Sequence, residues 1–143
     1  NMFMSEYHHS LDTKGRLIIP TRFREQLGSN FILSKGMEHC LCIYPKEEWK
    51  KLTDKLCASP SITNSKIRRL NRFFFTGSVE CEPDKQGRIL IPPSLRAYAS
   101  LEKEVIVAGV GSRIEIWDRE AWEEYNTFDD IEELAGSLED LQL

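Results

Sequence analysis

The stretch Asp12-Thr13-Lys14-Gly15-Arg16-Leu17-Ile18-Ile19-Pro20 occurs twice in this chain of 143 residues. Asp84-Lys85-Gln86-Gly87-Arg88-Ile89-Leu90-Ile91-Pro92 repeats it 72 residues later, and Arg24 recurs in the same frame as Arg96. At average residue frequencies, the shared Asp, Gly, Arg and Pro have a chance probability of roughly one in a hundred thousand. The chain is therefore predicted to contain two copies of one small unit that share a core.

Each copy is predicted to begin with a β-hairpin around the repeated stretch. A short polar and apolar alternation, residues 7–11 or 79–82, precedes it, and a continuous apolar run closed by proline follows it. Two strand-like runs separated by a few residues that include glycine are typical of a hairpin. Gly15 and Gly87 can supply the positive φ that such a turn requires.

The remaining elements are expected in the same order in both copies. Short helices are predicted at residues 21–27 and 94–99, and closing helices at 46–56 and 119–125. Strands are predicted at residues 31–35, 40–44, 104–108 and 113–117. The fold class is therefore expected to be mainly β with peripheral α-helices.

The segment between the copies, residues 63–74, is predicted to be an amphipathic basic helix. Its apolar residues recur at helical spacing with arginines on the complementary faces: Ile67, Leu70, Phe74, Arg68, Arg69 and Arg72. This apolar face is expected to join the core or a subunit interface. The expected organisation is a first module at 2–60, a linking helix at 61–76, a second module at 77–127 and an acidic tail at 128–143, the tail being a loosely docked helix or partly disordered.

The formal charge of −4 conceals an asymmetry between the two halves. Residues 1–72 carry 13 Lys and Arg against 7 Asp and Glu, whereas residues 73–143 carry 6 against 16. Taken alone, the acidic sum argues mildly against a nucleic-acid partner. The partition instead indicates a basic first copy that suits a polyanion.

The composition is that of an ordinary globular protein, with 41% apolar and 29% charged residues. No apolar stretch approaches the ~20 residues of a membrane span, and the N-terminus has no signal-peptide pattern. We expect a cytoplasmic protein that begins naturally at Met2 and has no membrane partner. Its four cysteines lack the spacing of a disulfide framework and are expected to be reduced.

The repeated motif carries the strongest chemical signal. In an architectural interpretation, Asp12 and Asp84 bond to turn amides while the arginine of each motif pairs with the aspartate across the loop. In a binding interpretation, Lys14 and Arg16 sit at a tight turn from which they can reach a phosphate or a guanine edge. On the residues alone, DNA or RNA contact and plain architecture are about equally favoured.

The chain as a whole resembles the MraZ family. The resemblance is carried by the two Asp-x-x-Gly-Arg-x-x-x-Pro segments, by Arg72-Phe73-Phe74-Phe75-Thr76-Gly77, and by the closing Arg113-Ile114-Glu115-Ile116-Trp117. It implies two pseudo-symmetric AbrB/SpoVT-like β-hairpin modules that form a double-split β-barrel-type core. It also implies a ring-shaped homo-oligomer, associated with the nucleoid, that regulates transcription of the bacterial division and cell-wall gene cluster by binding direct repeats in double-stranded DNA upstream of its own operon.

The family's DNA-binding motif maps onto Asp12 and Arg16 in the first module and onto Asp84 and Arg88 in the second. With their basic and turn neighbours, the expected DNA-binding residues are Asp12, Thr13, Lys14, Arg16, Arg22, Arg24, Asp84, Lys85 and Arg88. Glu80 and Glu82 precede the second motif. The first module is therefore expected to be the main DNA reader, and the second to set geometry or subunit contacts.

Other functions find less support. His39-Cys40-x-Cys42 lacks the paired spacing of a structural zinc site, so no metal and no cofactor are expected. No phosphate-binding glycine loop and no nucleophile signature occurs, so we expect neither an enzyme nor a small-molecule substrate. The alternative that stays open is an antitoxin-type regulator of the same fold that acts mainly on a basic protein partner through its acidic tail.

Overall fold

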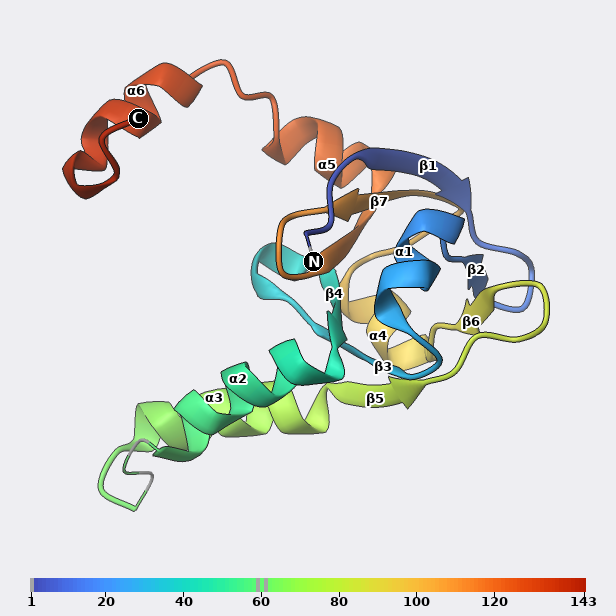
Figure 1. Ribbon diagram of the computed structural model, residues 1–143, viewed down its shortest axis with the longest axis horizontal. Helices are drawn as coiled ribbons and strands as arrows, with labels where there is room; N and C mark the ends of the chain where they lie inside the picture. The colour runs from blue at the N-terminus through green and yellow to red at the C-terminus, as the bar shows by residue number, and fades with distance from the viewer. Residues whose placement is uncertain (1, 59, 61) are drawn as a thin grey trace.

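The centre of the structure is a six-stranded antiparallel sheet with the order β1-β7-β8-β4-β3-β5 (Figure 1). The computed structural model describes residues 2–58, 60 and 62–143; residue 1, before the expected start, and residue 61, at an expected module boundary, lie outside this description. The strands are β1 (Glu6–Ser10), β3 (Phe31–Lys35), β4 (Leu41–Pro45), β5 (Ser78–Cys81), β7 (Glu104–Gly109) and β8 (Ile114–Asp118). The four strands predicted outside the repeated motifs are all present to within one residue.

The two copies exchange their first strands. β1 pairs with β7 of the second copy, with Glu6 opposite Ala108 and Ser10 opposite Glu104, and β5 pairs with β3 of the first copy. From either edge of the sheet, the order is therefore the first strand of one copy followed by two strands of the other copy. The expected local hairpin ladders are wrong, because the alternation of polar and apolar residues identifies a strand but not its partner.

The apolar runs after the two turns form a separate two-stranded ribbon of β2 (Arg16–Ile18) and β6 (Arg88–Leu90). The Ile19 amide donates to the Gly87 carbonyl at 2.9 Å, and the Ile91 amide donates to the Gly15 carbonyl at 3.0 Å. Each strand of the ribbon is therefore hydrogen-bonded at its end to the turn of the opposite copy. Within the described residues the large sheet stays open at β1 and β5, so the barrel-type core is not closed as a barrel.

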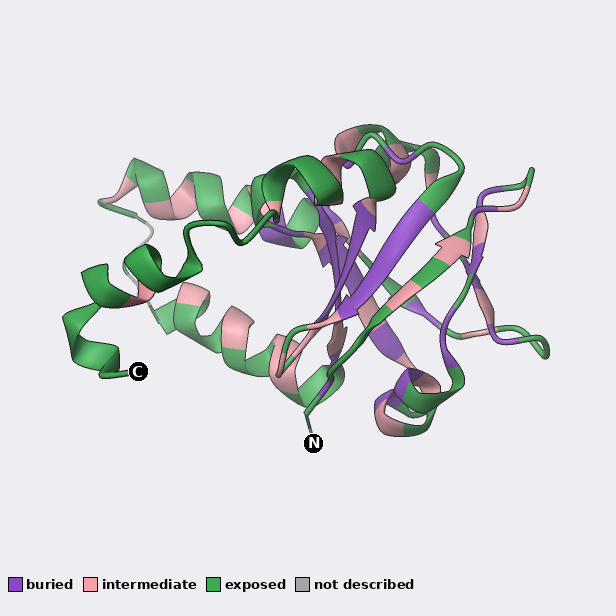
Figure 2. Cartoon of the chain, turned by 90° about the horizontal axis from the view of Figure 1, so that it is seen from above, coloured by how far each residue is buried: buried purple, intermediate pink, exposed green. Residues whose placement is uncertain are grey.

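Helices lie at the periphery of this core, as the sequence predicts, and the last one before the C-terminus stands clear of it (Figures 1 and 2). They are α1 (Thr21–Leu27), α2 (Lys46–Ala58), α3 (Ser65–Thr76), α4 (Pro93–Tyr98), α5 (Arg119–Tyr125) and α6 (Ile131–Ser137). Two short 3-10 turns lie at Met37–His39 and Glu139–Leu141. The linking helix starts two residues later than expected because the Asn64 side chain caps it, accepting from the Lys66 and Ile67 amides. Among the described residues, no helix has the length and apolar character that a membrane crossing requires.

The main core lies between the ribbon and one face of the large sheet. Leu17 and Ile89 project from the ribbon into it and are almost fully buried. Phe23 of α1 packs edge-on against Phe3 and Tyr7, with ring centroids 5.7 and 5.2 Å away. A second apolar cluster on the other face includes Trp117, Trp122 and Cys42.

Candidate nucleic-acid interface

The first turn is held by the Asp12 carboxylate. Oδ1 accepts from the Lys14 amide and from the Arg16 amide, each at 2.9 Å. Oδ2 accepts from the Arg16 guanidinium Nε at 2.6 Å. Asp12 therefore fixes both the backbone of the turn and the direction of the Arg16 side chain, which confirms the architectural interpretation of this aspartate.

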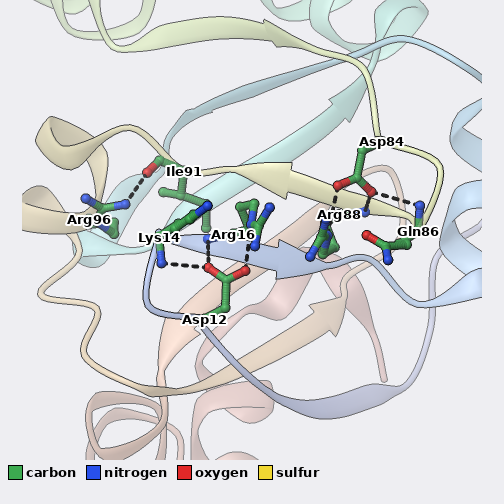
Figure 3. A network of polar contacts seen from close by, with 8 residues as sticks. All are labelled: Asp12, Lys14, Arg16, Asp84, Gln86, Arg88, Ile91 and Arg96. Atoms are coloured by element: carbon green, nitrogen blue, oxygen red, sulfur yellow. Dashed lines mark hydrogen bonds and ion pairs between the residues drawn. The ribbon is translucent and has the colours of Figure 1, made fainter.

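The second turn repeats this geometry (Figure 3). Asp84 Oδ1 accepts from the Gln86 and Arg88 amides at 2.9 Å, and Oδ2 accepts from Arg88 Nε at 2.8 Å. In both turns these bonds lower the pKa of the aspartate, and the largest contribution comes from the arginine amide. A carboxyl group whose pKa is lowered by folding stabilises the folded state at pH values above its unfolded pKa, which is near 4. This stabilisation is lost as the pH falls through the pKa of the folded state. Both turns therefore stay formed at neutral pH.

The ribbon brings the two arginines onto one exposed face. Arg16 lies opposite Leu90 and Ile18 lies opposite Arg88, and opposing residues of an antiparallel pair project to the same side. Leu17 and Ile89, between them, point into the core. We call this outer face of the ribbon the platform. Arg16 and Arg88 lie at two diagonally opposite corners of it. Ile18 and Leu90 lie at the other two corners and are 45% and 58% exposed.

Arg24 and Arg96 connect the copies. Arg24 Nε donates to the Ile19 carbonyl at 3.0 Å, and its guanidinium lies directly against Gly87 of the other copy. Arg96 Nη1 donates to the Ile91 carbonyl at 2.8 Å and lies in the same way against Gly15. Each arginine thus supports the turn of the opposite copy, a use that the sequence motif does not reveal.

The remaining candidates occupy the surroundings of the platform. Thr13, Lys14 and Lys85 are exposed at the tips of the two turns, and Arg22 is exposed on α1. The structure therefore gathers the turn residues, whereas Arg24 is already engaged with backbone. Sequence reasoning missed Gln86, Ile18 and Leu90, although the 72-residue offset aligns Gln86 with Lys14 and Leu90 with Ile18.

A protein-family comparison bears directly on this duplicated arrangement. The family model described as "MraZ protein, putative antitoxin-like" matches the chain twice, over residues 2–73 and 74–139. The two matches together span nearly the whole chain. The chain belongs to the MraZ family. This confirms the resemblance drawn from the repeated motif.

Curated MraZ relatives align along their full length. The protein of Moorella thermoacetica is 52% identical over 99% of this chain and 100% of its own. The protein of Heliobacterium modesticaldum is 53% identical over the same shares, and that of Alkaliphilus metalliredigens is 54% identical over 98% of this chain and 99% of its own. All three are named "Transcriptional regulator MraZ".

One cluster of possible metal ligands occurs among the described residues of this MraZ chain. The Cys40 and Cys42 sulfurs and a Glu115 oxygen lie within 4.8 Å of one another, whereas His39 stacks on Tyr98 instead. Both Glu115 oxygens are already used: Oε1 accepts from Trp117 Nε1 at 2.9 Å, and Oε2 accepts from an Arg113 nitrogen at 2.8 Å. A hydrogen bond with Cys42, together with burial, raises the pKa of the Cys40 thiol. We therefore interpret the cluster as a hydrogen-bonded part of the core.

Proposed function

We propose that this chain is a sequence-specific DNA-binding regulator of the bacterial division and cell-wall gene cluster. It binds direct repeats upstream of its own operon as a nucleoid-associated, ring-shaped oligomer. The observation that carries the proposal is the exposed platform of the β2–β6 ribbon, with one oriented arginine from each copy. The names of the relatives agree with a role in transcription.

The platform suits a base edge. Asp12 and Asp84 occupy only the Nε donor of their arginines, and the terminal nitrogens have no partner among the described residues. A guanidinium held in this way presents two donors that match guanine O6 and N7. A two-stranded ribbon also fits the major groove, where Ile18 and Leu90 can contact thymine methyl groups. The arginines therefore read bases, and the apolar pair adds sequence preference.

One ribbon is small, so binding requires several copies. A single small module buries too little surface for the affinity of a typical regulator. A ring that presents several ribbons to regularly spaced repeats gains avidity, because every contact after the first is intramolecular. Direct repeats, rather than one isolated site, are therefore the expected target.

The proposal is tested by mobility shift on the upstream DNA. The full chain should retain the natural repeat array at least tenfold more tightly than a fragment of equal length and composition in which the repeats are shuffled. Retention should also weaken steeply with salt, because phosphate contacts release counterions. Equal retention of the natural and shuffled fragments at every salt concentration would contradict sequence-specific binding.

Lys14 should contribute affinity without specificity. Its side chain is exposed at the turn tip and acts as a point charge toward phosphate. Lys14→Ala should weaken binding to all sequences by a similar factor and reduce the slope of log K against log salt by about 1. Lys50→Ala on α2, which is far from the ribbon in Figure 1, is the charge-matched control. An unchanged slope for Lys14→Ala would show that this residue makes no phosphate contact.

A further inference from the structure

One face of α3 forms an open groove that combines apolar side chains with cations. The groove has a volume of ≈ 640 Å³ and is lined mainly by Met37, Lys66, Arg69, Leu70, Arg72 and Phe73. Met37 is 53% and Leu70 is 40% exposed. No ion pair joins Lys66, Arg69 or Arg72 to any residue that the structure describes. The groove therefore presents positive charge and apolar surface along the same helix.

Phe73, which lines the groove, is held in place by neighbouring side chains. The Phe73 ring packs edge-on against Phe74 and Tyr98, with centroids 5.0 and 5.8 Å away. The Lys35 ammonium lies over the same Phe73 ring at 5.6 Å. The groove is thus formed before any partner arrives, which lowers the entropic cost of filling it.

The C-terminal tail, residues 128–143, has the complementary character. Four apolar residues recur along it at steps of three, four and three residues and form an apolar stripe: Ile131, Leu134, Leu138 and Leu141. The first two lie on α6, the other two lie beyond its end at Ser137, and each is about half exposed. The tail also carries six carboxylates and no lysine or arginine. This acidic segment with its bare apolar stripe has no partner that covers the stripe among the residues that the structure describes.

The tail is held away from its own groove. Phe128 packs against Trp122 of α5 with ring centroids 6.5 Å apart, and Trp122 packs against Trp117 of the sheet at 5.7 Å. The Ile131 amide donates to the Phe128 carbonyl, which ties the start of α6 to this anchor. Figure 1 shows α6 standing clear of the body and of α3. The partner of the tail is therefore expected on another molecule.

We propose that the tail of one copy lies in the α3 groove of a second copy. The tail stripe sits on Leu70 and Phe73, and its carboxylates face Lys66, Arg69 and Arg72. The groove is long enough, because the 12 residues of α3 span ~18 Å and the 7 residues of α6 span ~10 Å. Groove and tail are different surfaces of the described chain, so the contact can pass from copy to copy and close into a ring.

Charge exchange tests this contact on the full chain. Glu132→Lys with Glu133→Lys, or Arg69→Glu with Arg72→Glu, should each weaken self-association at least tenfold by sedimentation equilibrium at moderate salt. The four substitutions together should restore much of the assembly, because the charges are again opposite. Glu25→Lys with Glu102→Lys makes the same charge change on exposed side chains elsewhere and should leave the mass unchanged. Unchanged mass in both reversed variants would overturn the proposal, and so would failure of the fourfold variant to recover.

Cross-linking identifies which molecule the tail occupies. In a Cys57→Ser background, which removes the exposed native thiol, a chain with Leu70→Cys is mixed with a chain with Leu134→Cys. Oxidation should join the two chains. A disulfide that forms only within a chain carrying both substitutions would overturn the proposal in favour of docking on its own groove.

This inference rests on the proposed function only in the claim that the assembled oligomer binds DNA. The tail contact and DNA binding can be tested separately. Arg16→Ala should lose DNA and keep its mass, whereas the reversed tail should lose mass in the absence of any DNA.

Discussion

Arg16→Ala should weaken binding to the upstream repeats by about fivefold to more than a hundredfold, which corresponds to ~1 to 3 kcal/mol for a bidentate base contact. It should also flatten the preference for natural over shuffled DNA, since Arg16 is proposed to read a base. The turn itself should survive, because Asp12 still accepts from the amides of residues 14 and 16. Competitive mobility shifts at fixed salt measure both effects.

Arg88→Ala is the matched comparison. Its guanidinium has the same bond to its aspartate and a similar exposure, so geometry alone predicts equal losses. The difference must come from charge outside the turns, because each turn carries one lysine, Lys14 or Lys85. The exposed Glu80 and Glu82 precede the second turn, where His8 and Ser10 precede the first. We therefore expect Arg88→Ala to cost less than Arg16→Ala. Equal losses would refute the asymmetry while leaving DNA binding itself intact.

Gly87→Ala should destabilise the fold by about 2 to 3 kcal/mol. Gly87 has φ +79°, a conformation that costs other L-residues roughly 1 to 2 kcal/mol. An added Cβ would also lie 2.5 Å from Arg24 Cζ, so Arg24 must give up its bond to the Ile19 carbonyl at roughly 1 kcal/mol. Urea unfolding monitored by circular dichroism measures the loss.

A double-mutant cycle separates the two contributions. Combining Gly87→Ala with Arg24→Ala should cost less than the sum of the single changes, because the side chain that obstructs the new methyl is gone. Combining Gly87→Ala with Arg96→Ala should be additive, since Arg96 supports the opposite turn. Additivity in both pairs would mean that Arg24 does not support the second turn.

Much of the fold was predictable because local signals were consistent. The helix at Thr21–Leu27 and the strand at Phe31–Lys35 lie where the pattern predicts them. Strand pairing was not predictable, since period-two alternation marks a face and leaves the partner open. Ser10 lies opposite Glu104, 94 residues away. Only the folded sheet shows that the strands on either side of each turn belong to different ladders.

In the candidate site, too, contacts within one motif were predictable and contacts between the copies were not. The bonds of Asp12 to its own turn are local and follow from the motif. The contact of Arg24 with Gly87 crosses between copies, so spacing within one motif carries no trace of it. The same holds for Cys42, whose sheet partner Glu115 is fixed by the pairing of β4 with β8.

The exchange of β1 and β5 bears on how such a chain could have originated. A single copy would have to borrow its edge strand from a second molecule, so its folding would depend on concentration as in an obligate dimer. Joining both copies in one chain makes that association intramolecular. It also allows the two turns to differ in sequence. A symmetric dimer must present the same residue in both turns, whereas this chain carries Lys14 in the first and Gln86 at the equivalent position of the second. Gene fusion would thus have turned a symmetric reader of DNA into one whose two ends can differ.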